Sequence, residues 1–169
     1  MKGELCNFCL KSGILCSKCQ SKVKSGQIGN TYLEIARLLL SLEEKYPPLQ
    51  DVYFHNAIEE DGILALVVGR GDVARLLGFG GKITRAIGEK TGKTVRILEQ
   101  NVDDRKFIED LFAPLAVLTI NTIWLPDGTM ETRVILRRRG RRPLPIDVKA
   151  MKQIAKKVRN MTLRVEFSG

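Results

Sequence analysis

The sequence predicts an α+β protein in which two units of similar element order follow a short cysteine-rich segment. Helical and strand-like apolar spacings alternate twice along the 169 residues, first over 30–101 and again over 102–169. All four cysteines precede both units and lie within residues 1–25. We therefore expect three parts, a cysteine segment at 1–25 and two larger units at 30–101 and 102–169.

Composition limits the class of protein and points to a partner. The hydrophobic content of 44% is enough for real cores, and neither a membrane-length apolar run nor a signal-peptide stretch is present, so we expect a soluble cytoplasmic protein. The net charge of +9 is uneven: Arg133–Arg164 holds 12 bases and one acid, and the rest holds 16 bases and 18 acids. Such segregation favours a polyanion-binding surface over an ordinary solvated basic face.

The cysteine segment has the spacing of a metal site. Two Cys-x-x-Cys pairs are present, formed by Cys6, Cys9, Cys16 and Cys19. Four thiolates in two such pairs match tetrahedral Zn²⁺ in a structural site, and metal binding would supply the folding energy of so short a segment. Two disulfides or an iron centre are the alternatives. The nearby Phe8, Lys11 and Lys18 would contact RNA, contact a protein partner, or cover the site.

Residues 30–101 begin with a helix and two strands. After a linker at 25–30, Thr31 and Glu34 have the spacing of a capping box, and apolar residues at helical intervals predict a helix from Thr31 to Lys45. The helix must stop before Pro47-Pro48. Strands are expected at 51–58 and 63–68, joined by a turn at 59–62, and a last strand at 94–98.

Between the last two of these strands lies a glycine-rich stretch that predicts two short helices joined by a turn. We expect Asp72 to cap the first helix, Gly78 to end it in the left-handed region, and the second to start at Gly81 or Lys82. A phosphate can approach glycine backbone, and the positive end of a helix dipole favours an anion. Neither a P-loop nor a dinucleotide fingerprint fits, because Leu76 replaces the first P-loop glycine and Gly78 would break a crossover helix too early.

The string Leu77-Gly78-Phe79-Gly80-Gly81-Lys82-Ile83 resembles the GXXG loop of the KH RNA-binding module. The predicted order of helix, strand, strand, helix, turn, helix and strand resembles the type II KH form found in bacterial ribosomal proteins and in NusA. The resemblance implies single-stranded RNA binding, with about four nucleotides clamped through their backbone. Phosphates would meet amides around Gly78, Phe79, Gly80 and Gly81, Lys82 and Arg85 would add charge, and Ile83, Ile87 and Val95 would support or line the groove.

Residues 102–169 resemble a second, degenerate KH unit. Asp103 and Asp147 are expected to cap helices, and strands are expected at 118–124, 131–136 and 162–167. No GXXG turn is present; an arginine-rich loop with two prolines stands there instead. Its guanidinium groups can bind phosphate in a fork and stack on bases. We expect RNA contacts from Arg137, Arg138, Arg139, Arg141 and Arg142, extended along the final helix by Lys149, Lys152, Lys156 and Arg159.

The whole chain resembles archaeal NusA-like proteins, with an added N-terminal zinc knuckle. The resemblance implies binding of a nascent transcript in transcription elongation or termination. Two alternatives remain open: a ribosome- or rRNA-associated factor, and an adaptor whose knuckle binds RNA polymerase. Catalysis is not expected, because the one histidine, His55, lies on a predicted strand without a nucleophile motif. No membrane or small-molecule substrate is expected as a partner.

Overall fold

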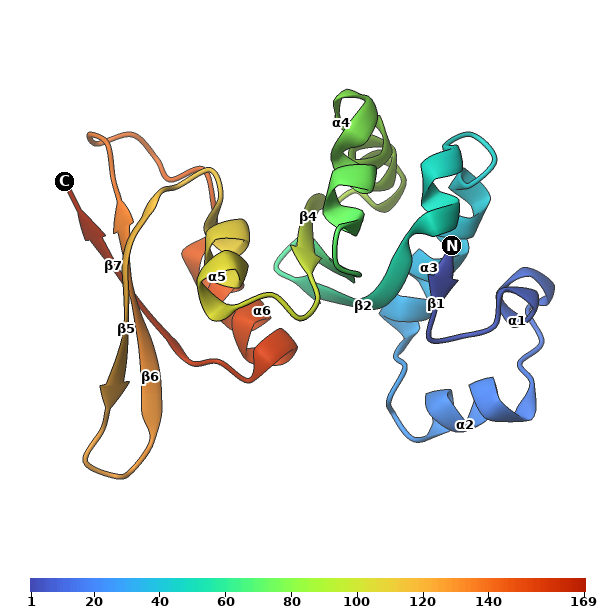
Figure 1. Ribbon diagram of the computed structural model, residues 1–169, viewed down its shortest axis with the longest axis horizontal. Helices are drawn as coiled ribbons and strands as arrows, with labels where there is room; N and C mark the ends of the chain where they lie inside the picture. Colours follow the sequence, from blue (N-terminus) through green and yellow to red (C-terminus); the bar gives the residue numbers. More distant parts are fainter. The chain divides into compact units, whose positions relative to one another are not determined.

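A computed structural model describes residues 1–169 except Phe79 and divides them into two compact units, Met1–Asn101 and Val102–Gly169. The fold is mixed α+β, with one small sheet in each unit (Figure 1). The cysteine segment belongs to the first unit. In the described part of the chain, no helix is both long and apolar enough to cross a membrane.

The sheet of the first unit has four strands in the order β1-β2-β3-β4. Its members are β1 (Lys2–Gly3), β2 (Tyr53–Glu60), β3 (Ile63–Val68) and β4 (Thr94–Glu99). The β2–β3 pair is antiparallel, whereas β1 is parallel to β2 and β4 is parallel to β3. All six residues of β3 are buried, as their continuous apolar run predicts for a central strand. The edge strand β1 was not anticipated, because two residues carry no period.

Helices pack on this sheet: α3 (Asn30–Leu42), the short 3-10 helix η1 (Pro47–Asp51) and α4 (Asp72–Thr91). The predicted helix α3 is confirmed, but its capping and its C-terminal end differ from the prediction. It begins after Gly29 with no side-chain cap, so the capping box does not form, and it ends at Leu42 rather than Lys45. Its buried face includes Tyr32, whose ring stacks on Phe54 with centroids 4.5 Å apart and whose hydroxyl donates to the Phe54 carbonyl at 3.0 Å.

The cysteine segment shares the core of the first unit. It contains two short helices, α1 (Asn7–Ser12) and α2 (Ser17–Lys24). Leu5, Leu10 and Ile28 are buried in one apolar cluster with residues of α3 such as Leu39. The expected linker at 25–30 is therefore partly core, because Ile28 anchors it. Burial of these side chains makes the segment an integral part of the first unit.

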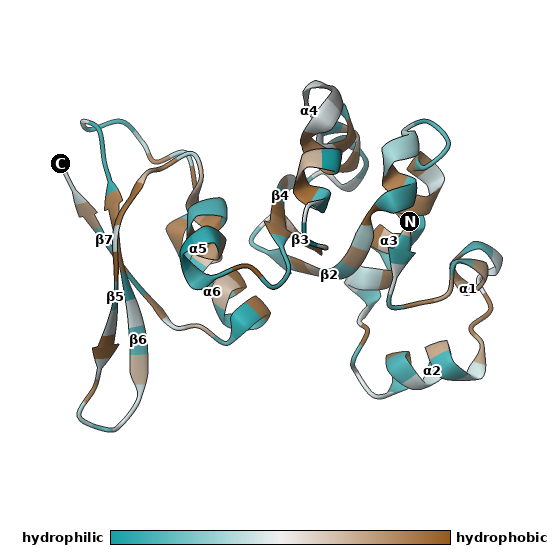
Figure 2. Cartoon of the chain, viewed as in Figure 1, coloured by the Kyte–Doolittle hydropathy of each residue, from teal (hydrophilic) through white to brown (hydrophobic). Residues whose placement is uncertain are grey.

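The second unit repeats the order of α3, β2, β3, α4 and β4 in the first unit and the pairing of those three strands. It consists of α5 (Asp104–Phe112), β5 (Val117–Trp124), β6 (Met130–Arg137), α6 (Val148–Arg159) and β7 (Leu163–Ser168). The strands lie in the order β5-β6-β7, with an antiparallel pair followed by a parallel pair. Both predicted caps are confirmed: Asp103 accepts from the Lys106 amide, and Asp147 from the Ala150 amide. Figure 2 shows the loop between β6 and α6 as mostly hydrophilic.

Candidate nucleic-acid interface and metal centre

The glycine-rich stretch forms a reversal within α4. Gly80 and Gly81 have left-handed backbone, with φ of 64° and 76°. The Thr84 hydroxyl donates to the Leu76 carbonyl at 3.3 Å, although residues eight apart in a straight helix are separated by about 12 Å. The element therefore consists of two limbs that meet at this turn, as Figure 1 shows. The left-handed residues are Gly80 and Gly81, so the prediction that Gly78 takes this conformation was wrong.

The start of α4 also differs from the prediction. Gly71, with φ of 83°, is the capping residue, and it has no side chain to bond the first turn. Asp72 is instead buried, at 4% exposed, and accepts a hydrogen bond from the Tyr53 amide at 2.9 Å while pairing with Arg75. A buried carboxylate needs such partners. Asp72 thus ties α4 to β2.

The residues predicted to bind RNA at this turn lie in three environments. Phe79 falls outside the described residues. Lys82 and Arg85 are exposed, and the Arg85 guanidinium donates to the Gly80 carbonyl at 3.0 Å, which closes the turn. Ile83 and Ile87 are fully buried and belong to the core, so they cannot line a groove floor.

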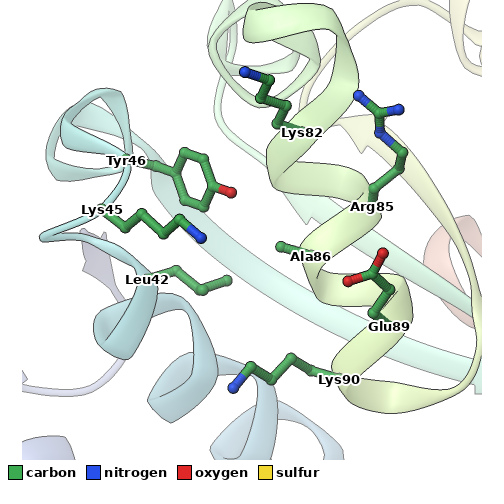
Figure 3. A pocket seen from close by; sticks show the side chains of 8 residues that line it. All are labelled: Leu42, Lys45, Tyr46, Lys82, Arg85, Ala86, Glu89 and Lys90. Carbon is green, nitrogen blue, oxygen red and sulfur yellow. The ribbon is translucent and has the colours of Figure 1, made fainter.

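A basic groove that the sequence did not predict lies between the chain that follows α3 and the second limb of α4 (Figure 3). Its volume is about 470 Å³. The walls combine bases with apolar surface: Leu42, Lys45, Tyr46, Lys82, Arg85, Ala86, Glu89 and Lys90. The sequence signal for this groove is the pair Lys45-Tyr46 just before Pro47-Pro48, but Lys45 was predicted only as the last residue of a helix.

The arginine loop of the second unit is exposed as predicted. Arg137, Arg138, Arg139, Arg141 and Arg142 all face solvent, as do Lys149, Lys152 and Lys156 on α6. Four of these arginines line a pocket of about 480 Å³ together with apolar residues that include Leu115 and Leu144. The Arg138 guanidinium lies 5.9 Å from the ring centroid of Phe167 on β7. The loop is therefore positioned by local contacts while its charges remain accessible.

Three other bases of the second unit have structural partners. Arg159 donates to the Val102 carbonyl at 2.6 Å and to the Asp104 carboxylate at 3.0 Å, so these bonds hold it at the start of α5, and its contact with RNA stays a prediction. On the sheet, Arg133 pairs with Glu166 at 2.6 Å, and Arg164 pairs with Glu131 at 3.1 Å. The hydrogen bond from Arg133 lowers the pKa of Glu166 and correspondingly raises the pKa of Arg133.

The four cysteines are brought together in the first unit. All are free thiols, so the disulfide alternative is not realised, and their sulfur atoms lie within 4.8 Å of one another. The Cys6 and Cys19 sulfurs are 3.6 Å apart. A tetrahedral ion with bonds of about 2.3 Å to sulfur separates its ligands by about 3.8 Å. The cluster therefore has the dimensions to hold a metal ion.

The surroundings of the sulfurs also suit ligation. The Cys6 amide donates to the Cys19 sulfur at 3.4 Å, and the Cys16 amide donates to the Cys9 sulfur at 3.3 Å. Hydrogen bonds lower the pKa of Cys16 to about 6, and the bond from the Cys19 amide has the largest effect. Hydrogen bonds with the Cys19 and Cys16 side chains, followed by charge repulsion, raise the pKa of Cys6 to about 12. Four thiolates this close repel one another, and a bound cation removes that penalty.

Comparisons with known proteins find partial similarity. The chain is 31% identical over 96 residues to the "Probable transcription termination protein NusA" of Methanocaldococcus jannaschii, covering 54% of this chain and 51% of that protein. It is 27% identical over 70 residues to the protein of the same name from Methanococcus vannielii, covering 41% of this chain and 39% of that one. The aligned region thus spans about half or less of these relatives.

A solved structure gives a likeness of fold alone. The crystal structure of APE1850 aligns with a TM-score of 0.54 and 18% identity, covering 79% of this chain and 96% of that chain. No protein-family model matches the sequence.

Proposed function

We propose that the protein binds single-stranded RNA and acts as a NusA-like factor in transcription elongation or termination. The observation that carries the proposal is the reversal at Gly80 and Gly81, where two left-handed glycines leave backbone accessible between two helical limbs. A ligand phosphate can approach such a turn because no Cβ stands in its way. The similarity to two relatives named as probable transcription termination proteins supports the transcription role.

Both units are type II KH units in this proposal. The shared pattern of one antiparallel and one parallel strand pair supports it, as does the position of the glycine turn between β3 and β4. The first unit clamps RNA through backbone at Gly78, Gly80 and Gly81. The second has no such turn among its described residues and uses the arginine loop and the lysines of α6 instead.

The metal in this proposal is a structural Zn²⁺ held by Cys6, Cys9, Cys16 and Cys19. Two of these cysteines, Cys9 and Cys19, are buried. Four protein ligands complete the tetrahedral coordination of a structural Zn²⁺. The protein is then a cytoplasmic binding protein rather than an enzyme. The sulfur geometry also suits iron, so metal analysis of the purified protein decides between the two.

The glycine turn can be tested by a charge change at Gly78, where backbone φ is ordinary and an added Cβ meets nothing within 4 Å. We expect Gly78→Asp to weaken binding of a fluorescent 12-nucleotide oligouridine at least tenfold relative to Gly78→Asn. The two side chains have the same shape, and only the carboxylate repels phosphate. Equal affinities of the two variants would move RNA binding away from this turn, towards the arginine loop.

A second candidate function is a ribosome- or rRNA-associated role, favoured by the exposed arginines, which bind any RNA backbone. Crosslinking in cells followed by sequencing of the bound RNA separates the two roles. Nascent transcripts support the transcription role, and rRNA supports the ribosomal one. Recovery of RNA polymerase without RNA would favour the adaptor role of the cysteine segment.

A further inference from the structure

The basic groove of the first unit has four bases and one acid in its walls. The acid is Glu89; the bases are Lys45, Lys82, Arg85 and Lys90. Lys82 and Lys90 make no ion pair or hydrogen bond within the described part of the chain, and both are exposed. Unpaired ammonium groups that face one open groove create a field that attracts anions.

The groove has an apolar floor as well as charge. Figure 3 shows Leu42 and Tyr46 extending towards α4 from one side, with Ala86 facing them from the second limb. The Lys45 ammonium lies 5.6 Å from the centroid of the Tyr46 ring, which holds that charge at the rim. A volume of about 470 Å³ falls within the range of small-ligand sites. Apolar floor and basic rim together match a nucleotide, which has a flat base and a charged phosphate.

The groove is continuous with the glycine turn. Lys82 directly follows Gly81, and Arg85 both lines the groove and donates to the Gly80 carbonyl. From Lys82 to Lys90 the second limb advances about 12 Å, so the bases form a row along the helix rather than a single point. This continuity favours an RNA strand that leaves the turn over an unrelated acidic peptide.

We propose that this groove is an extension of the RNA site, in which Lys45, Lys82 and Lys90 hold the phosphates of nucleotides beyond the glycine turn. The proposal rests on the RNA-binding function proposed above. It assigns the strand a path along the face of α4 that is turned towards α3. Lys90 lies farther from the turn along the second limb than Lys82 does, and in this proposal Lys45 and Lys90 hold the phosphates beyond the four nucleotides bound at the turn.

The test compares 4- and 12-nucleotide fluorescent oligouridines on the full-length, metal-loaded protein. We expect Lys45→Gln with Lys90→Gln to weaken binding of the 12-mer about tenfold and to change the 4-mer less than twofold. The slope of log affinity against log salt should fall by about 1.4 for the 12-mer, if the two lysines each neutralise one phosphate. The matched control is Lys2→Gln with Lys24→Gln, which removes two exposed charges from β1 and α2, outside the groove.

A 12-mer affinity that falls no more than in the control overturns the groove proposal. If Gly78→Asp still weakens both RNAs in that case, the glycine turn survives and only the extension fails. If the native protein binds neither RNA, both proposals fall. A 4-thiouridine placed near the end of the 12-mer gives an independent readout. Crosslinks to peptides that contain Tyr46 support the groove, and crosslinks confined to the second unit contradict it.

Discussion

The two units of this protein share a helix, an antiparallel strand pair, a second helix and a parallel strand, and they differ in the segment that follows the antiparallel pair. In the first unit β3 leads into a helix that reverses at Gly80 and Gly81. In the second unit β6 ends at Arg137 and leads into an exposed loop with four more arginines. A glycine turn binds a polyanion through backbone groups that must be held in one conformation. An arginine loop binds through the charge of its side chains and does not need one fixed backbone conformation. If the proposed function holds, the same topology contacts RNA in two different ways.

Charge follows the same division. The first unit has 14 bases and 11 acids, and the second has 14 bases and 8 acids, giving net charges of +3 and +6. The cysteine cluster lies in the first unit, and its segment shares that unit's apolar core. The less basic unit therefore combines the glycine turn with a cysteine cluster that could hold a metal ion, and the described residues of the more basic unit contain neither.

The largest expected effect comes from breaking the metal site. Cys9→Ala removes a buried ligand, and we expect the first unit to lose more than about 4 kcal/mol of unfolding free energy, because metal binding and core packing are coupled there. Hydrogen exchange resolved by peptide should show loss of protection in residues 1–101 and little change in 102–169. Ser21→Ala, an exposed change on α2, is the control. Full protection after chelation would contradict the coupling.

A smaller effect is expected from neutralising the arginine loop. Replacing Arg137, Arg138, Arg139, Arg141 and Arg142 by Gln should weaken oligouridine binding about tenfold and lower the salt slope by about 0.7 for each phosphate that the loop no longer neutralises. The exposed positions of these side chains mean that stability should change little. The comparison variant is Lys149→Gln with Lys152→Gln and Lys156→Gln on α6. An unchanged salt slope in the loop variant would leave RNA binding to the first unit alone.

The sequence predicted most elements, because their periodicity and caps are local. Strand β3 and the caps at Asp103 and Asp147 are confirmed, since a continuous apolar run and a short acidic side chain before a helix act within a few residues. Features that depend on distant partners were missed. Asp72 was predicted to cap a helix, but its burial beside the Tyr53 amide depends on a residue 19 positions away.

The candidate site shows the same limit. The glycine turn was expected from its residues, yet the string of glycines did not reveal which of them become left-handed; Gly80 and Gly81 do, and Gly78 does not. The groove beside Lys45 and Tyr46 is formed by two segments far apart in the sequence, so no local pattern could predict it. Likewise, a count of bases could not separate the exposed Arg139 from Arg159, which is held by Asp104.

The smallest expected effect concerns the ion pair between Arg133 and Glu166 on the sheet of the second unit. Arg133 lowers the pKa of Glu166, so this carboxylate stabilises the folded unit above its unfolded pKa of about 4.3, and that contribution is lost as the pH falls through the lower folded value. Glu166→Gln should therefore flatten the decline in stability that occurs as the pH falls below about 5 and through the lowered pKa of Glu166. Urea titrations followed by the fluorescence of Trp124, the only tryptophan and a residue of the same sheet, measure this. The control is Glu109→Gln, whose partner Arg105 lies on α5. An unchanged pH profile would mean that the pair is open in solution, and Arg133 would then join the charges available to RNA.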